Sequence, residues 1–491
     1  MKRFTRIAYL VLMLLGLLIV PSVHAQGTPD QILYAVRKDS GDLMFYTVNI
    51  DGGVKNQIGV VREYGSQAGW SPDGNFIYLL ENTYLDHSTL TLVDAKTNRH
   101  QTIPDRLEPA TCSLPFWWSP NGEWLAYSTL SDSQTLLKMM NPVTGDVQIL
   151  AGADLSYGEL HWSNDGRYVT YPTGFSTSGS GYRFVIYDLH NQKTVSVLNV
   201  TASSEMSWSP IENRIVFKNS DSLDINVYNL ADGTKQEYKG DNIGIWSPDG
   251  QFLTIYHRDI NDKFLLSVID VVANKTLELD GVISEPGVDT RDVVWSSDGR
   301  YLAVPVIEYQ VDYRRTIYVL DIADRTSRRL TLAPVYYNKI AWSPVGDWLT
   351  FASRSDSETG TSFTSLWLFD VFHQTHQEFE VEFPPYYYIY NGNWSADGRY
   401  IIVGTQAVGS IVLIDRESGQ ITPIAASLPK FDEIIWSPYG SRAILTSQSY
   451  DIYVFTPENH ALVNITNTSD EIELFYAWQG TKRNKSFFNC G

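Results

Sequence analysis

The sequence predicts an all-β fold, a β-propeller of about ten four-stranded blades in one ring. A unit related to Trp-Ser-Pro-Asp-Gly recurs along the chain, with its tryptophans 38 to 52 residues apart. A second mark, Asp or Asn followed four residues later by Gly, Asn or another polar residue, recurs in step with it. A period of this length with four short strands per unit is typical of propeller blades. The tryptophans of the units are Trp70, Trp118, Trp162, Trp208, Trp246, Trp295, Trp342, Trp394, Trp436 and, in a reduced copy, Trp478.

One unit shows how the residues give four strands. Residues 242–246 form a short strand that ends at the tryptophan, and Ser-Pro-Asp-Gly at 247–250 is a type I turn whose glycine takes positive φ. The run 251–256 is apolar at most positions, as expected for a strand sandwiched between neighbouring blades. Strands at 264–269 and 275–279 complete the unit.

The second mark predicts a tight hairpin between the third and fourth strands. Asn, Asp and Gly tolerate left-handed backbone at low cost, so the residue four positions on is expected to have positive φ. The pairs are Asn49/Gly53, Asp94/Asn98, Asn141/Gly145, Asp188/Gln192, Asn229/Gly233, Asp270/Asn274, Asp321/Arg325, Asp370/Gln374, Asp415/Gly419 and, in worn form, Thr456/His460.

The two ends of the repeat predict how the ring closes. Residues 32–58 hold strands two to four of a unit without a tryptophan strand before them, and the last unit has only the strand that ends at Trp478. Joined, the two halves make one blade and bury the edge strands. A split into two smaller propellers is the alternative, although no Pro/Gly/Ser-rich linker marks a boundary.

The chain divides into a signal peptide at 1–25, the propeller at 31–480 and a C-terminal tail at 481–491. Lys2, Arg3 and Arg6 precede an apolar run at 7–20, and Val23-His24-Ala25 offers a cleavage site. The run is short for a membrane span. An exported protein in the periplasm, at the cell surface or outside the cell is expected, with no stable membrane insertion after cleavage; an uncleaved anchor is the alternative.

The formal net charge of −19 argues against nucleic acid as a partner, because binding to phosphates is driven by Lys and Arg. Two cysteines, Cys112 and Cys490, are too few for a zinc cluster. They lie just before the second tryptophan motif and just after the last, close to where the ring closes. In an oxidising compartment they could pair as a disulfide, and two unpaired thiols are the other interpretation.

The Trp-Ser-Pro-Asp-Gly units, complete at 70–74 and 246–250, resemble the repeats of TolB-like, WD-repeat-like β-propellers. The resemblance covers residues 32–478 and implies a fold rather than an activity, since such propellers serve as scaffolds, receptor-like domains and gates of peptidases. The amino-terminal domain of TolB and the α/β-hydrolase domain of dipeptidyl-type peptidases have no counterpart among these residues.

The sequence shows no Gly-x-Ser-x-Gly elbow, His-Glu-x-x-His motif, phosphate-binding glycine loop or EF-type calcium loop. No cofactor, metal site or catalytic residue is therefore predicted. His373 and His376 have the spacing of metal ligands, but a solvated turn is the better interpretation. The motif aspartates and tryptophans are assigned to turn capping and blade packing.

We therefore predict a non-enzymatic, monomeric interaction module that binds a protein, peptide or glycan. Its variable loops fall on the face opposite the short turns, and tyrosine and arginine are common at binding hot spots. The alternative for the tyrosines is that they only cover the blade tops. The rival function is a carbohydrate- or peptide-active hydrolase or lyase at the channel mouth, with acid pairs such as Asp289/Asp292. The predicted ligand-binding residues are Asp289, Arg291, Glu308, Tyr309, Asp312, Tyr313, Arg314, Arg315, Tyr386, Tyr387 and Tyr388.

Overall fold

The structure is a computed structural model of the 491-residue chain. The residues that it describes are 31–62, 66–83, 87–107, 114–130, 135–150, 159–176, 179, 181–258, 264–277, 293–308, 314–330, 340–356, 362–381, 393–404, 411–424, 431–447, 451–466 and 472–480.

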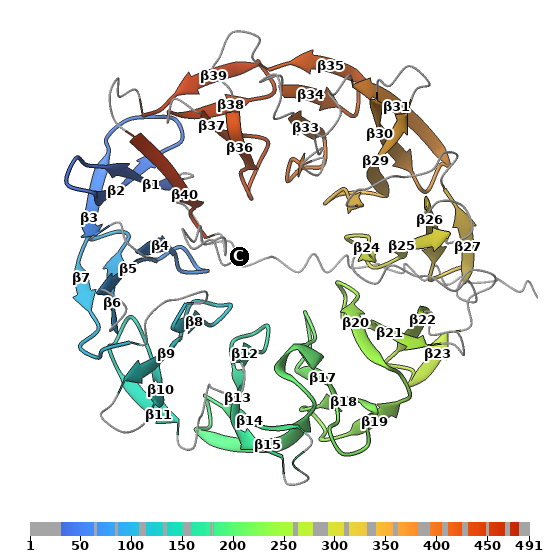
Figure 1. Cartoon of the computed structure of the whole chain (residues 1–491), viewed down its shortest axis with the longest axis horizontal. Coiled ribbons are helices and arrows are strands. Elements are labelled where there is room, and N and C mark those ends of the chain that lie inside the picture. The colour runs from blue at the N-terminus through green and yellow to red at the C-terminus, as the bar shows by residue number, and fades with distance from the viewer. Residues whose placement is uncertain are drawn as a thin grey trace, which may run out of the picture.

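The described residues form ten four-stranded antiparallel sheets, set as blades around a central axis (Figure 1). In each blade the strand that carries the unit tryptophan lies nearest the axis, and the following strands lie successively farther out. The prediction of a single ten-bladed ring is confirmed, and the alternative of two smaller propellers is wrong. We number the blades along the chain, from blade 1, which holds residue 31, to blade 10.

The strands are given blade by blade, from the inside outward. Blades 1 to 3 consist of β40 (Ile472–Trp478), β1 (Gln31–Arg37), β2 (Asp42–Asn49) and β3 (Asn56–Arg62); β4 (Gln67–Trp70), β5 (Phe76–Thr83), β6 (His87–Asp94) and β7 (His100–Thr102); and β8 (Phe116–Trp118), β9 (Leu125–Leu130), β10 (Thr135–Met140) and β11 (Val147–Leu150). Blades 4 to 6 consist of β12 (His161–Trp162), β13 (Tyr168–Phe175), β14 (Tyr182–Asp188) and β15 (Lys193–Val200); β16 (Met206–Trp208), β17 (Arg214–Lys218), β18 (Ile225–Asn229) and β19 (Lys235–Tyr238), preceded by the 3-10 helix η2 (Ser203–Glu205); and β20 (Asn242–Trp246), β21 (Phe252–Arg258), β22 (Phe264–Asp270) and β23 (Lys275–Leu277). Blades 7 to 10 consist of β24 (Val294–Trp295), β25 (Tyr301–Glu308), β26 (Arg314–Asp321) and β27 (Thr326–Arg329); β28 (Ala341–Trp342), β29 (Trp348–Asp356), β30 (Ser362–Asp370) and β31 (Thr375–Val381); β32 (Asn393–Trp394), β33 (Tyr400–Gly404), β34 (Ile411–Asp415) and β35 (Gln420–Pro423); and β36 (Phe431–Trp436), β37 (Ala443–Ser447), β38 (Ile452–Thr456) and β39 (Ala461–Asn464).

Blade 1 closes the ring as predicted. Strand β40 pairs antiparallel with β1, from Ile32 opposite Trp478 to Arg37 opposite Ile472. The indole of Trp478 is 1 % exposed, and it packs in one core with Ile32 of β1 and Ile444 of blade 10. Because β40 takes the innermost place, the edge of β1 is paired and not open to other chains.

The turn after each tryptophan is built around its serine. In blade 7, Ser296 is completely buried; its hydroxyl donates to Asp298 (2.6 Å) and accepts from the backbone N–H of Tyr301 (2.8 Å). Asp298 also accepts from the backbone N–H of Arg300 (3.0 Å). The motif aspartates are thus engaged in holding the turn, as the sequence indicated. Equivalent serines are completely or almost completely buried at 71, 119, 163, 209, 247, 343, 395 and 437.

The hairpins between third and fourth strands have the predicted backbone. All ten residues at the fourth position after the Asp or Asn mark have positive φ, including Arg325 (55°), Gln374 (59°) and His460 (53°). Left-handed backbone therefore occurs even where the residue is neither Gly nor Asn, because the tight turn demands it.

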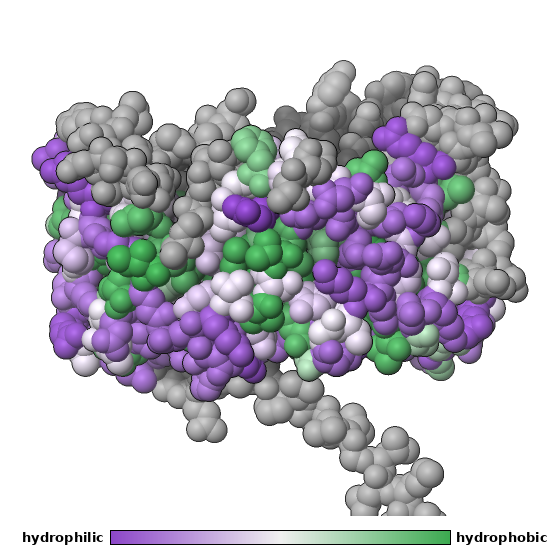
Figure 2. All heavy atoms as spheres, turned by 90° about the horizontal axis from the view of Figure 1, so that it is seen from below, coloured by the Kyte–Doolittle hydropathy of each residue, from purple (hydrophilic) through white to green (hydrophobic). Residues whose placement is uncertain are grey.

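The cores lie between blades, where each unit tryptophan packs on the blade before it. Trp342 stacks on Tyr301 with ring centroids 6.0 Å apart, and its indole N–H donates to the carbonyl of Val294 (3.0 Å). Trp208 likewise stacks on Tyr168 at 6.1 Å. The indole N–H group is thereby satisfied while the ring area is buried. On the rim, polar side chains predominate and apolar ones form separate patches (Figure 2).

Replacing the buried serine of one turn tests this account of the motif. We expect Ser296→Ala to lower the free energy of unfolding by about 1–2 kcal/mol, because the N–H of Tyr301 loses its buried acceptor. The matched control Ser40→Ala removes an exposed hydroxyl and should change it by less than about 0.5 kcal/mol. Urea unfolding followed by tryptophan fluorescence measures both; equal values for the two variants would contradict the assignment.

Candidate functional site

Three blades carry the same arginine clasp on the short-turn face. The fifth residue after the tryptophan is Arg167, Arg300 or Arg399, and its guanidinium lies 4.9 to 5.0 Å from the ring centroid of the tyrosine that follows it. Each arginine also pairs with the aspartate that begins the hairpin of its own blade. The pairs are Arg167–Asp188 (2.8 Å), Arg300–Asp321 (2.9 Å) and Arg399–Asp415 (2.9 Å).

The clasp of blade 4 shifts the acidity of its carboxylate. Burial raises the pKa of Asp188, but hydrogen bonds from Arg167 and Asn191 outweigh this effect and lower the pKa to about 2. Asp188 therefore stays ionised through the neutral and mildly acidic range, and the clasp is a charged hydrogen-bonded pair over an aromatic ring.

Blade 3 lacks the clasp. The corresponding residues are Glu123 in place of the arginine, Trp124 in place of the tyrosine and Asn141 in place of the aspartate. The glutamate bears the charge opposite to that of the arginines, so it has no favourable interaction with the negative face of an aromatic ring. Trp124 is partly buried and packs against the core between blades 3 and 4.

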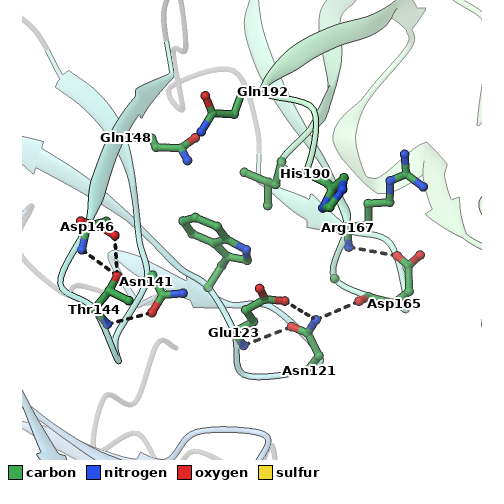
Figure 3. Close-up of a pocket in the computed structure, with 13 residues that line it drawn as sticks. Asn121, Glu123, Asn141, Thr144, Asp146, Gln148, Asp165, Arg167, His190 and Gln192 are labelled. Atoms are coloured by element: carbon green, nitrogen blue, oxygen red, sulfur yellow. Dashed lines mark hydrogen bonds between the residues drawn. The ribbon is translucent and has the colours of Figure 1, made fainter.

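A groove of about 740 Å³ occupies the place where the clasp is missing, between blades 3 and 4 (Figure 3). Thr144 and Asp146 lie on one wall and His190 and Arg167 on the other, with Gln148 and Gln192 approaching each other at one end (Figure 3). We call it the blade 3–4 groove. Its lining residues are Asn121, Glu123, Trp124, Asn141, Thr144, Asp146, Gln148, Asp165, Gly166, Arg167, Leu189, His190 and Gln192.

Hydrogen bonds fix the walls of this groove. Asn121 donates to the carbonyl of Asp165 (2.9 Å) and so ties the turn of blade 3 to that of blade 4. Thr144 donates from its hydroxyl to Asp146 (2.7 Å). Two backbone hydrogen bonds close the hairpin that carries Thr144 and Asp146. The N–H of Gly145 donates to the carbonyl of Asn141 (2.8 Å), and the N–H of Asn141 donates to the carbonyl of Asp146 (2.9 Å). The groove is therefore preorganised and needs little ordering when a ligand binds.

The structure describes only the backbone of three of the predicted ligand-binding residues, so it neither brings the predicted set together nor separates it. Asp289, Arg291, Tyr309, Asp312, Tyr313, Tyr386, Tyr387 and Tyr388 lie outside the described residues, as do Asp292, Cys112 and Cys490. The backbone of Glu308 ends β25, and Arg314 and Arg315 begin β26. Glu308 pairs in register with Arg314, and their side chains are not described.

The histidines with ligand-like spacing have structural partners. His373 lies in the β30–β31 turn, where its Nδ1 is 2.8 Å from a carboxylate oxygen of Asp370, and His376 stacks on Phe369 at 5.1 Å. His161 is largely buried, and this burial lowers its pKa. Within the described residues, no group of three or more His, Cys, Asp or Glu side chains is placed to hold a metal ion. No helix in that part of the chain is long and apolar enough to cross a membrane.

The blade 3–4 groove is lined by residues of the short turns and hairpins, whereas the predicted ligand-binding residues belong to the variable loops. A usable signal was present, namely Glu-Trp at 123–124, where three other units have Arg-Tyr. It becomes meaningful only when the partner of each arginine is known.

Comparisons with known proteins give distant structural matches only. No family model matches the chain, and no curated protein matches it. Among solved structures, a eukaryotic initiation factor is 13 % identical, with a TM-score of 0.49 over 81 % of this chain and 96 % of that chain. TolB from Acinetobacter baumannii is 14 % identical, with a TM-score of 0.26 over 63 % and 65 %. The WD40 domain of Sif2 is 16 % identical, with a TM-score of 0.34 over 67 % and 91 %.

The ten sheets make the chain a β-propeller, and its distant structural matches include TolB and WD40 propellers. At these identities the matches transfer no activity.

The clasp of blade 4 has a measurable signature in acid. The pKa of Asp188 is about 2 in the folded protein, below the 3.8 of a free side chain. Its contribution to the free energy of unfolding is therefore complete above about pH 5 and is lost as the pH falls toward 2. We expect Asp188→Asn to cost about 1–2 kcal/mol at pH 7 and to flatten the fall in stability between pH 4.5 and 2. Urea titrations across this range measure both effects. The free energy of unfolding of the exposed control Asp39→Asn should fall with pH as steeply as that of the wild type. An equally steep fall for Asp188→Asn would refute the assignment.

Proposed function

We propose that this chain is an exported, non-enzymatic interaction module that holds a segment of a partner protein in the blade 3–4 groove. The observation that carries the proposal is the groove itself, a preformed polar hollow of about 740 Å³ with a partly buried tryptophan among amides, hydroxyls and carboxylates. Aromatic rings supply contact area and the polar groups supply orientation, which is the usual composition of a ligand site.

The polar groups of the groove favour binding over catalysis. The carboxylate of Asp165 accepts from Ser163 (2.6 Å), from the backbone N–H of Arg167 (3.0 Å) and from Asn213 (2.9 Å). Asp188 is held in the clasp. These carboxylates are engaged in the framework, while Glu123, Gln148 and His190 present polar groups to the hollow.

The second part of the proposal concerns the variable-loop face. The residues from Asp289 to Tyr388 named above remain a predicted binding sector, and a partner held at both faces would span the ring.

Export rests on the basic start and apolar run of residues 1–20. Expression with the native leader should yield a secreted chain that begins at Gln26, as read by mass spectrometry of the intact protein.

A peptide-display selection on the immobilised protein tests the groove. Dodecapeptides selected on the wild type should bind His190→Trp at least about tenfold more weakly, because an indole at this exposed position fills the hollow. The matched control is Phe372→Trp, which stands at the equivalent place between blades 7 and 8 and should bind like the wild type. Selected peptides that bind all three proteins alike would show that the groove is not the binding surface.

A further inference from the structure

We propose that the blade 3–4 groove is a receptor for a guanidinium group, the side chain of an arginine in a partner peptide. This inference deepens the proposed function and rests on it. It follows from comparing the groove with the places that the chain fills with its own arginines.

The site between blades 7 and 8 is the same place in the repeat. Counted from the unit tryptophans, Arg300 and Tyr301 correspond to Glu123 and Trp124. Counted from the hairpins, Arg328 corresponds to Gln148. The correspondence extends through the lining, with Asp321, Asp324, Thr326, Val371, Phe372 and Gln374 in the places of Asn141, Thr144, Asp146, Leu189, His190 and Gln192.

Arginines largely fill the site between blades 7 and 8. Its hollow measures about 250 Å³, against about 740 Å³ between blades 3 and 4. The guanidinium of Arg300 covers Tyr301, and Arg328 donates to the carbonyl of Val371 across the blade boundary. The blade 3–4 groove is therefore the same site with both of its guanidinium groups replaced, one by a carboxylate and one by an amide.

Trp348 is the other tryptophan that occupies the position of Trp124 in the repeat. It shows that the cation covering such a ring need not come from the same blade. Trp348 of blade 8 also follows an acidic residue, Asp347, and it is covered by Arg416 of blade 9, whose guanidinium lies 5.4 Å from the ring centroid. The residue of blade 4 that corresponds to Arg416 is Leu189. Among the described residues, no cation lies over Trp124, so Glu123 and Trp124 lack the counterpart of the arginine that covers Trp348.

Charge at the groove favours a cationic ligand. Glu123 and Asp146 are exposed carboxylates on its lining, and Asp165 adds a third. The basic side chain Arg167 is already paired with Asp188. The chain as a whole carries a formal net charge of −19, which attracts basic segments to its surface.

Guanidinium fits this set better than ammonium does. Its plane can stack on Trp124 while its N–H groups reach Glu123 and the side-chain oxygen of Gln148, as Arg300 stacks on Tyr301 and reaches Asp321 in blade 7. A lysine would supply charge without the planar stack. We therefore expect the groove to rank arginine above lysine, and lysine above the uncharged citrulline.

Short peptides test the chemistry directly. The probe is acetyl-Gly-Ser-Arg-Ser-Gly-amide, compared with its lysine and citrulline counterparts by ligand-observed NMR on the full chain. The wild type should bind the arginine peptide at least about fivefold more tightly than the citrulline peptide, and the difference should shrink as sodium chloride rises.

A rebuilt clasp provides the decisive variant. Glu123→Arg combined with Asn141→Asp restores the arrangement of Arg300 and Asp321, so the chain's own guanidinium should occupy the groove and abolish the preference for arginine. Its melting temperature should be no lower than that of the wild type, which separates lost binding from lost folding. The control Glu237→Arg, on exposed strand β19, adds the same charge as Glu123→Arg and should keep the preference.

The outcomes separate this inference from the proposed function. Equal binding of the arginine and citrulline peptides, no binding of either, or a preference that persists in the rebuilt variant would overturn the guanidinium assignment. So would binding of a neutral oligosaccharide that the rebuilt clasp abolishes. If display-selected peptides are still lost in His190→Trp, the groove remains a peptide site of other chemistry. If they are not, the proposed function itself fails.

Discussion

Closure of the ring is the constraint on which the rest of the structure depends. Each blade buries its apolar faces against two neighbours, so the first and last segments of the repeat must meet for any blade to be fully covered. Strand β40 meets this need by pairing along β1, and Trp478 fills the core that blades 1 and 10 share. The short turns add a second set of links between blades, such as the bond from Gln479 to the carbonyl of Gly74 (3.0 Å).

Within a closed ring, a single junction between blades can lose part of its packing without loss of the fold. The arginine clasp recurs in blades 4, 7 and 9, whereas blade 3 has exchanged it for Glu123, Trp124 and Asn141. The serine turn and the stacked strands of blade 3 remain, so the exchange opens a hollow without disturbing the blade. A repeated scaffold can thus carry a specific site where one copy has residues that differ from those of blades 4, 7 and 9.

The residues that specify backbone geometry were readable from the sequence. Ser-Pro-Asp-Gly turns and the Asp or Asn marks predict positive φ at fixed positions of each unit. Their regular spacing gave the blade count and the mixed blade 1. The groove was not readable in the same way. Its signal is the mismatch between Glu123 and Arg300, and its meaning depends on a hairpin residue about twenty positions away that only the folded blade brings into contact. The loop residues from Asp289 to Tyr388 remain predictions, since variable loops carry no repeat from which their geometry follows.

The mixed blade also makes closure of the ring depend on the order in which the strands are synthesised. During synthesis β1, β2 and β3 are made first, and their inner neighbour β40 is made only after the other nine blades. Until then the inner edge of β1 has no partner and blades 1 and 10 have no common core. The final strand thus acts as a check on completeness, because a chain interrupted anywhere before residue 472 lacks the segment that seals the ring. A stalled product would keep an open strand edge, which is a recognisable mark for chaperones and proteases.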